Sequence, residues 1–228
     1  MGSRITLLRP GVVAYDDALA LQHRLADDVR AGDGETLILL EHPPTYTFGV
    51  RGKREHLLVS ADALRARGAA VAQTDRGGDV TFHGPGQVVG YPIMNIRARG
   101  IGPATYVCML ERSLIRALAA FGIDAERVNG RPGVWTRGGK IAAIGVRVSR
   151  GVTTHGFALN VNTDLSWFSH IIPCGLPDVT VTSMQRIAGH PFSMHEVESE
   201  LVRAFGREFA PTSSLFCDLT AEEVTVGR

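Results

Sequence analysis

Lysine is nearly missing from this sequence. The chain of 228 residues holds 24 cationic side chains, and only Lys53 and Lys140 among them are lysines. Cysteine is scarce too: Cys108, Cys174 and Cys217 are odd in number and far apart. That spacing argues against a disulfide framework and against a CxxC metal site. We therefore expect a reducing, cytoplasmic setting.

Other absences exclude whole classes of protein. No apolar run approaches the ~18 residues of a membrane span, and no secretory signal is evident at the N-terminus. A net charge of +1 provides no basic field for nucleic acid. The eight histidines form no HExxH motif, so we expect no metal site. We also expect no cofactor.

The composition predicts an ordinary globular domain. Hydrophobic residues make up 44% of the chain and charged residues 21%, which is enough to bury a sizeable core. Repeats and linkers are lacking, so we expect one domain over residues 1–228.

Periodicity predicts a mixture of helices and strands. Helical spacing and capping signals favour helices at 14–31, at 61–68, from Pro103 to Gly122 and after Ser193, which forms a capping box with Glu196. Strands are expected at 5–9 and 36–42, with a loop at 41–49 and hairpins at 76–95 and 140–161. The fold class is α+β, a mixed β-sheet with flanking helices.

The second hairpin, KIAAIGVRVS followed by VTTHGFALNV, places small residues on one face of each strand. Ala143 and Gly145 share a face of the first strand, and Gly156 and Ala158 share a face of the second. Glycine inside a strand often marks the close approach of a ligand or of another backbone. Two interpretations are open: a shallow trough for a slim, flexible ligand such as an acyl chain, or close packing of a helix on the sheet.

The first hairpin, RGGDVTFHGPGQ, combines a cation, glycines and a histidine within twelve residues. Arg76 could bind an anion, and His83 could donate or accept a proton. The glycines would let backbone approach a substrate closely. It has no GK[ST] and so is not a P-loop. The alternative is an ordinary hairpin with glycine turns and a structural histidine.

Cys174 stands between a proline and a glycine in IIPCGLPD. A thiol has an ordinary pKa of about 8.5, and a nearby ammonium favours the thiolate. Arginine could supply that charge, but only a lysine can also release its proton near neutral pH once buried. This makes Lys140 a candidate partner and base. By strict alternation Lys140 faces away from Ala143 and Gly145, so the pairing needs a twist or bulge at the start of its strand.

Several motifs together resemble the lipoyl(octanoyl) transferase family. The resemblance runs from about residue 36 to 184 and is carried by EHPPTYTFG, RGGDVTFHGPGQ, NGRPGVW, KIAAIGVRV, THGFALN and PCG followed by VTSM. It implies a fold shared with biotin and lipoate protein ligases. Phe82 departs from the pattern, because the family often has tyrosine there.

The resemblance also implies roles for particular residues. Cys174 would be the acyl-thioester nucleophile, and Lys140 the residue that lowers its pKa. The implied substrate-binding residues are Arg76, Gly77, Gly78, Asp79, Val80, Thr81, Phe82, His83, Ala143, Ile144, Gly145, Gly156, Phe157 and Ala158.

The implied reaction transfers an octanoyl group from acyl carrier protein to a lysine of an apo lipoyl domain. The acceptors would be the lipoyl domains of 2-oxoacid dehydrogenase complexes and the glycine cleavage H protein. An ATP-dependent lipoate or biotin-type ligase is the main alternative, and it would need no cysteine nucleophile. A non-catalytic acyl carrier or scaffold is a second alternative, which the presence of both Lys140 and Cys174 argues against. A cysteine protease is the weakest, since no histidine and asparagine frame is evident.

Overall fold

A computed structural model describes residues 5–172, 179–210 and 217–219. The strands are β1 (Ile5–Val12), β2 (Glu35–Glu41), β3 (Thr45–Phe48), β4 (Ala70–Gln73), β5 (Val80–His83), β6 (Gln87–Ile93), β7 (Glu126–Val128), β8 (Arg131–Thr136), β9 (Gly139–Ser149), β10 (Val152–Asn160) and β11 (Cys217–Leu219). The helices are α1 (Tyr15–Ala31), α2 (Ala61–Ala66), α3 (Pro103–Ala119), α4 (Met184–Ala188) and α5 (Met194–Phe209), with short 3₁₀ helices η1 (Arg54–His56) and η2 (Leu165–His170).

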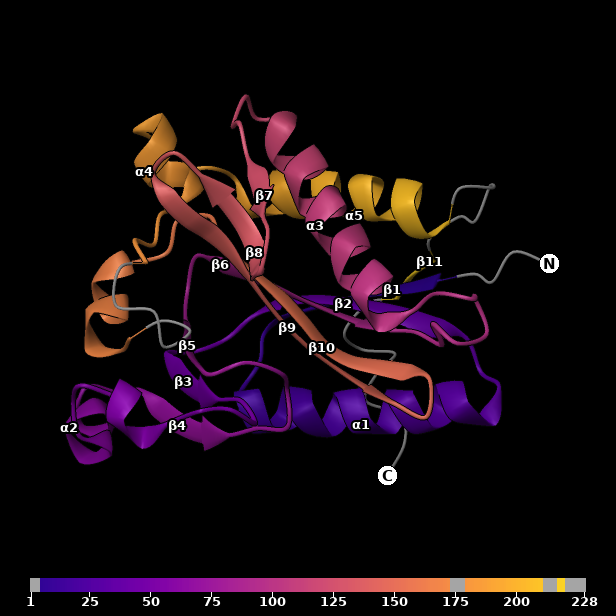
Figure 1. The fold of residues 1–228 in the computed structure, drawn as a ribbon, viewed down its shortest axis with the longest axis horizontal. Coiled ribbons are helices and arrows are strands. Elements are labelled where there is room, and N and C mark those ends of the chain that lie inside the picture. The colour runs from indigo at the N-terminus through magenta and orange to yellow at the C-terminus, as the bar shows by residue number, and fades with distance from the viewer. Residues whose placement is uncertain (1–4, 173–178, 211–216, 220–228) are drawn as a thin grey trace.

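The described strands form two sheets (Figure 1). The larger sheet has the order β11-β1-β2-β6-β10-β9-β8-β7, and the smaller has the order β4-β3-β5. In the larger sheet β1 pairs in parallel with β2 and β11, and the other pairs are antiparallel. This mixed sheet with flanking helices confirms the expected α+β class.

The larger sheet is covered on both faces. Leu37 and Leu39 of β2 pack into the core cluster that includes α3 and α5, whereas Ile38 and Leu40 pack into the cluster that includes α1. In Figure 1, α1 runs along one side of the sheet and α3 and α5 lie on the other. Burial on both faces explains why β2 is a continuous apolar run and shows no alternation with polar residues.

The helices expected from the sequence are present, with bounds close to the predicted ones. α1 ends at Gly32, whose left-handed backbone (φ 108°) caps the helix. α3 begins with Pro103 at its first turn. α5 begins after Ser193, whose hydroxyl accepts a hydrogen bond from the Glu196 backbone N–H (3.4 Å), as a capping box requires.

Two expectations about the strands were wrong. The stretch 41–49 is more than a loop, because its residues 45–48 form β3, the central strand of the smaller sheet. The segment 76–95 contains two strands as expected, but they do not pair with each other. β5 pairs with β3, and β6 pairs with β2 and β10. The turn between β5 and β6 thus carries the chain from one sheet to the other.

The second hairpin is confirmed. β9 and β10 pair antiparallel, with Gly145 opposite Gly156 and Ala143 opposite Ala158. Residues directly opposite in an antiparallel pair share a face, so the four small residues lie together. Figure 1 shows this long hairpin crossing the middle of the molecule.

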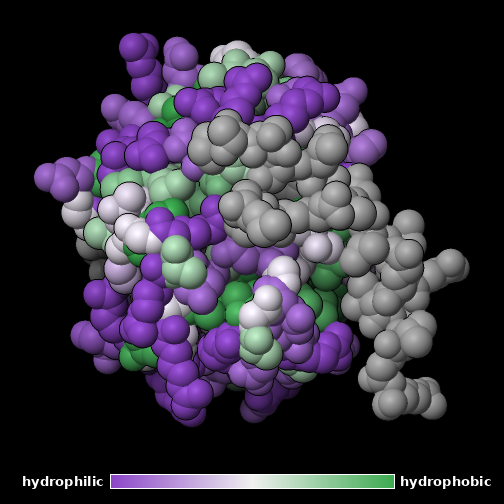
Figure 2. All heavy atoms as spheres, turned by 90° about the vertical axis from the view of Figure 1, so that its right-hand side faces the viewer, coloured by the Kyte–Doolittle hydropathy of each residue, from purple (hydrophilic) through white to green (hydrophobic). Residues whose placement is uncertain are grey.

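The large apolar side chains that are exposed among the described residues are Val12, Val50, Leu58 and Ile187. On the face seen in Figure 2, hydrophilic side chains dominate, and apolar side chains show mainly in the recesses between them. Among the residues that the structure describes, no helix has the length and apolar character needed to cross a membrane.

Candidate active site

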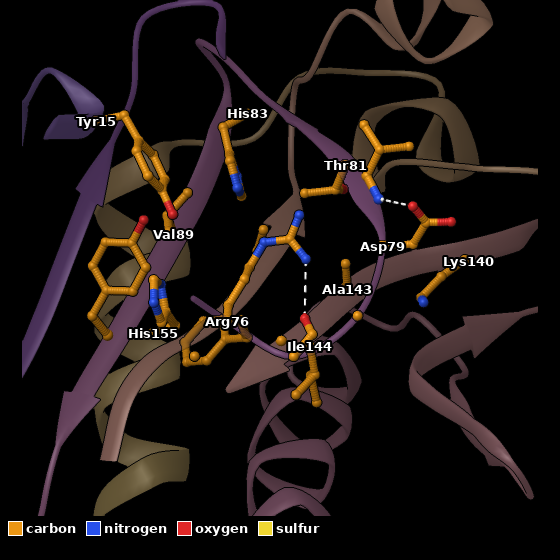
Figure 3. Close-up of a pocket in the computed structure, with 18 residues that line it drawn as sticks. Tyr15, Arg76, Asp79, Thr81, His83, Val89, Lys140, Ala143, Ile144 and His155 are labelled. Carbon is orange, nitrogen blue, oxygen red and sulfur yellow. Dashed lines mark hydrogen bonds between the residues drawn. The ribbon is translucent and has the colours of Figure 1, made fainter. Parts of the chain in front are cut away.

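A cavity lies between the glycine-rich segment, residues 76–83, and the β9–β10 hairpin (Figure 3). Every predicted substrate-binding residue except Phe82 lines it, together with Lys140. Four lining residues were not predicted: Tyr15, Val89, Tyr91 and His155.

The small residues of the hairpin form one wall of this cavity. Ala143, Gly145, Gly156 and Ala158 all line it. Gly145 also admits the glycine-rich segment, since a methyl group there would lie 3.0 Å from the Gly77 carbonyl oxygen and 3.2 Å from Cδ of Arg76. The interpretation as a trough therefore fits the structure, although the same small residues also permit close backbone packing.

The glycine-rich segment is held in place at Gly77 and at Asp79. The Gly77 N–H donates to the Val146 carbonyl of β9 (3.0 Å). The Asp79 carboxylate accepts from the backbone N–H groups of Lys53 (3.0 Å) and Val80 (2.8 Å) and pairs with the His56 ring. Asp79 therefore ties this segment to η1, and its carboxylate serves to organise the rim of the cavity.

Arg76 is buried in the cavity wall. Its guanidinium donates to the Thr47 hydroxyl (Nε at 3.2 Å, Nη2 at 2.9 Å), to the Thr47 carbonyl (2.5 Å) and to the Gly77 carbonyl (3.1 Å). The structure thus holds this cation against β3 of the smaller sheet. Thr47 was missed by the sequence analysis because the stretch that contains it was interpreted as a loop.

Lys140 reaches the same cavity through a bulge. Pairing between β8 and β9 shifts between Val134 and Trp135, so that Val134 opposes Ala142 while Trp135 opposes Lys140. Ile141 and Ala142, though adjacent in sequence, consequently both pack into the core. The bulge places Lys140 and Ala143 together on the cavity side. This is the irregularity that the expected pairing required.

The Lys140 side chain is buried among specific neighbours. Its Nζ lies 5.3 Å from the centre of the Trp135 ring, a cation–π distance. Its backbone N–H donates to the Thr180 carbonyl (2.8 Å), and its carbonyl accepts from the Thr182 N–H (3.0 Å). By contrast Lys53 is a surface residue, 64% exposed.

The contacts of His83 and Phe82 are mainly with other side chains of the protein. The His83 ring contacts Gln87 Oε1 through Nδ1 (2.8 Å) and the Thr47 hydroxyl through Nε2 (3.4 Å). Burial lowers the pKa of His83 well below its ordinary value, so the ring is neutral. The Phe82 side chain points away from the cavity and stacks on Trp167, with ring centres 5.4 Å apart.

One end of the cavity, with Tyr15 and His155 at the left of Figure 3, is aromatic. The Tyr91 hydroxyl lies 2.7 Å from Nε2 of His42, whose Nδ1 lies 2.7 Å from the Val13 carbonyl. A carbonyl only accepts, so Nδ1 carries the hydrogen and Nε2 accepts from Tyr91. Burial lowers the pKa of His42 to about 4.

His155 adopts an unusual backbone conformation at this end (φ 57°). Its ring Nε2 donates to the Asp75 carboxylate (2.6 Å), and its backbone N–H donates to Gln22 Oε1 (2.6 Å). Burial lowers the pKa of His155 to about 3. Non-glycine residues rarely adopt positive φ, and such strain is concentrated at functional sites. The sequence offered only the position of this histidine beside Gly156 as a signal.

Cys174, the predicted nucleophile, lies outside the described residues. The described residues on either side of its segment are anchored near the cavity. The Ile172 N–H donates to the His56 carbonyl (2.8 Å), and His56 pairs with the cavity residue Asp79. On the other side the Thr180 carbonyl accepts from the Lys140 N–H (2.8 Å).

The described side chains form no metal centre. Among residues 5–172 and 179–210, no group of three or more histidine, cysteine, aspartate or glutamate side chains is placed to hold a metal ion.

Comparison with known proteins identifies the class of enzyme to which this chain belongs. Residues 14–206 match the lipoyl protein ligase A/B catalytic domain. The octanoyltransferase of Chloroflexus aurantiacus is 49% identical over 204 residues, which cover 88% of this chain and 92% of that protein.

Solved structures show the same fold at low sequence identity. A bi-partite lipoate protein ligase from Thermoplasma acidophilum superposes with a TM-score of 0.69 at 20% identity, over 98% of this chain and 90% of that one. A biotin protein ligase from Aquifex aeolicus gives 0.51 at 15% identity, over 91% of this chain and 69% of that one.

The chain belongs to the lipoyl protein ligase A/B catalytic domain family, within it to the lipoyl(octanoyl) transferases. It is an acyltransferase, and its predicted fold, shared with biotin and lipoate ligases, is confirmed. The individual roles of the site residues remain predictions.

Proposed function

We propose that this enzyme moves an octanoyl group from acyl carrier protein to a specific lysine of apo lipoyl domains, through a thioester on Cys174. The main support is the position of Lys140. A lysine in an arginine-rich chain is buried and carried by a bulge into a cavity walled by small residues. The relatives named octanoyltransferase supply the chemistry that this arrangement suits.

The anchors of the segment that contains Cys174 support its role. Cys174 is two positions after Ile172 and six positions before Thr180. An extended chain spans at most about 3.5 Å per residue, so Cys174 is within ~7 Å of chain from the Ile172 anchor. That anchor joins the Asp79 rim of the cavity, and the other anchor is Lys140 itself.

The first half-reaction exchanges one thioester for another. The Cys174 thiolate attacks the carbonyl carbon of the octanoyl thioester, and the carrier's thiolate leaves and takes up a proton from the Lys140 ammonium, which becomes the neutral amine. This exchange is nearly balanced in energy, so no ATP is needed. Burial of roughly seven carbons of the acyl chain along the small-residue wall contributes ~5 kcal/mol at about 0.8 kcal/mol per CH₂.

The second half-reaction forms the amide. The lysine amine of the lipoyl domain attacks the thioester carbon, loses a proton to neutral Lys140, and Cys174 departs as the thiolate. A lysine can serve both steps, because its ammonium favours the thiolate and its neutral amine accepts the proton. We propose lipoyl domains of 2-oxoacid dehydrogenase complexes and the glycine cleavage H protein as acceptors, with the cytoplasm as the setting.

A second candidate follows from the likeness of the fold to lipoate and biotin ligases. Such an enzyme would activate a free acid with ATP and would not require Cys174. Turnover of octanoyl-carrier protein without nucleotide separates the two functions. Dependence on ATP and free octanoate would favour the ligase.

Mass spectrometry of the intact protein tests the proposal directly. Incubation with octanoyl-carrier protein should add one octanoyl group, which hydroxylamine should remove. Cys174→Ser should lose this hydroxylamine-labile adduct, whereas Cys108→Ala and Cys217→Ala should keep it. An adduct on Cys108 or Cys217 would overturn the assignment of the nucleophile.

A further inference from the structure

A row of buried polar side chains runs beneath the cavity from the glycine-rich segment to the residues that flank Lys140. Its side chains come from four different strands or their flanks, and each hydrogen-bonds to the next. In order, the row consists of Arg76, Thr47, His83, Gln87, Asn160 and the Thr182 carbonyl.

The direction of these hydrogen bonds can be deduced from the Thr182 end. A carbonyl only accepts, so the group facing Thr182 O at 3.0 Å is the Asn160 amide nitrogen, and Asn160 Oδ1 faces Gln87. Gln87 Nε2 donates to that oxygen (2.9 Å) and to the Phe82 carbonyl (3.1 Å). Gln87 Oε1 therefore accepts, and His83 Nδ1 must carry the hydrogen.

The Arg76 end is consistent with this tautomer. A guanidinium only donates, so the Thr47 hydroxyl accepts from Arg76. The hydrogen of that hydroxyl is available to His83 Nε2 (3.4 Å), which carries a lone pair when Nδ1 holds the hydrogen. The two ends thus agree on a neutral His83 protonated at Nδ1. All bonds run head to tail from the cation to the Thr182 carbonyl, an arrangement in which they strengthen one another.

The end of the row is joined to Lys140. Thr182 donates its N–H to the Lys140 carbonyl, and Val181 pairs with Lys140 in a parallel bridge. Asn160 holds the other side of Thr182 through its carbonyl. Gln87 and Asn160 are themselves almost fully buried, so water cannot readily replace these bonds.

We propose that Gln87 and Asn160 are positioning residues for Lys140, and that His83 is a neutral link between them and Arg76. The row fixes residues 180–182 against the bulged start of β9, and thereby fixes the direction in which the lysine enters the cavity. Its importance for turnover rests on the proposed function, because Lys140 must act for its position to matter. A displacement of about 1 Å at a reacting group can slow a reaction ~10²-fold.

The scarcity of lysine makes this position measurable. Protein labelled with ¹³C at lysine Cε has two signals, and a Lys53→Arg background leaves Lys140 alone. In that background Asn160→Ala and Gln87→Glu should shift or broaden the Lys140 signal. Gln87→Glu is the sharper variant, because a carboxylate keeps the bond from His83 but cannot donate to Asn160.

Asn162→Ala is the matched control. Asn162 lies two residues beyond Asn160, and its amide likewise holds backbone, bonding to the Phe192 carbonyl (2.8 Å) and N–H (2.9 Å). Its loss should lower thermal stability yet leave the Lys140 signal and the rate of amide formation unchanged. The two variants in the row should slow amide formation about 10- to 100-fold. ¹⁵N spectra at neutral pH should show His83 neutral and protonated at Nδ1.

The outcomes separate this proposal from the proposed function. An unchanged Lys140 signal in both Asn160→Ala and Gln87→Glu would overturn the positioning role, whatever Lys140 does. A changed signal with unimpaired amide formation would overturn it too, provided that Lys140→Ala is inactive. If Lys140→Ala is fully active, the proposed function fails, and the signal alone still decides whether the row positions the lysine. A His83 that is protonated at Nε2 would refute the deduced direction.

Discussion

A methyl group on Gly133 would lie 2.6 Å from Cε of Lys140. It would also lie 2.5 Å from the Ala142 carbonyl oxygen, and Gly133 has a positive φ of 123°. The backbone of β8 therefore passes directly against the lysine side chain at the β9 bulge. We expect Gly133→Ala to displace Lys140 and to lower turnover at least tenfold, measured as octanoyl transfer to a lipoyl domain.

Gly130→Ala provides the control for that substitution. Gly130 is also at positive φ (74°) and lies in the turn between β7 and β8, but nothing lies within 4 Å of an added methyl group. It should therefore carry the backbone strain, of roughly 1–2 kcal/mol, without touching the site. Equal losses of turnover in the two folded variants would show that strain, and not contact with Lys140, is responsible.

Lys140→Arg separates the two roles assigned to Lys140. The guanidinium keeps a positive charge, so the Cys174 thiolate should still form the acyl-enzyme. It cannot accept the incoming amine's proton at neutral pH, so the octanoyl-enzyme should accumulate in single-turnover mass spectra. Turnover equal to that of the parent would reduce Lys140 to a charge.

Lys140→Ala tests whether the positive charge of Lys140 lowers the pKa of the Cys174 thiol. Loss of a nearby cation should raise the pKa of the Cys174 thiol, so the pH midpoint of its alkylation rate should move upward. Lys53→Ala is the control, because Lys53 is an exposed residue paired with Glu55, and it should leave that midpoint in place. An unmoved midpoint in Lys140→Ala would refute the pairing.

The wall of small residues should set what the cavity accepts. Ala158 of β10 and Ala143 of β9 oppose each other on that wall, and Ala158→Leu adds three carbons inside it. We expect this variant to reject octanoyl and to retain shorter acyl groups, measured by acyl-enzyme formation across a series of chain lengths. Gly145→Val is a less clean test, because its side chain would also press on Gly77 and Arg76.

Normal octanoyl rates in a folded Ala158→Leu variant would place the acyl chain elsewhere. Its melting temperature should be compared with that of Ala143→Leu, which changes the same wall from the other strand. A loss of octanoyl acceptance in both, with shorter chains retained, would support the trough over the alternative of simple backbone packing.

Local sequence patterns predicted the helices and the β9–β10 hairpin. The β9–β10 hairpin has a short turn and alternating faces, so the sequence predicted the hairpin and the small-residue face of each strand, and the structure adds that Gly145 opposes Gly156. The bulge at Lys140 was expected only because the predicted pairing of Lys140 with Cys174 required a twist or bulge there. The sequence could not show that Ile141 and Ala142 would both be drawn into the core.

Partner choice over long sequence separations could not be predicted. The turn after His83 suggested a hairpin, but the partner of β5 is β3, and burial of a separate aromatic cluster around Tyr46 and Phe82 decides that pairing. The row of hydrogen-bonded side chains from Thr47 to Thr182 likewise could not be predicted from the sequence. Its members come from distant parts of the chain, and Gln87 and Asn160 appeared only as polar residues beside a turn and at a strand end.

Buried neutral histidines should make the fold sensitive to acid. Burial lowers the pKa of His42 from 6.5 to about 4, so between these values the unfolded chain binds a proton that the folded chain does not. The free energy of unfolding therefore rises with pH in this window, and stability is lost as pH falls from about 6.5 to about 4. At ~1.4 kcal/mol per pH unit, His42 alone accounts for roughly 3 kcal/mol.

Urea unfolding at a series of pH values measures this effect. His42→Gln removes the titrating ring while leaving an amide that can donate to Val13 and accept from Tyr91, the two partners of the histidine. The variant should lose less stability than the parent between pH 6.5 and 4, by up to roughly 3 kcal/mol. His155, whose pKa falls to about 3 for the same reason, should keep part of the slope. His190→Gln, which replaces an exposed ring, is the surface control for the substitution itself. A His42→Gln curve parallel to the parent's would contradict the prediction. It would show that His42 binds its proton equally in the folded and unfolded protein.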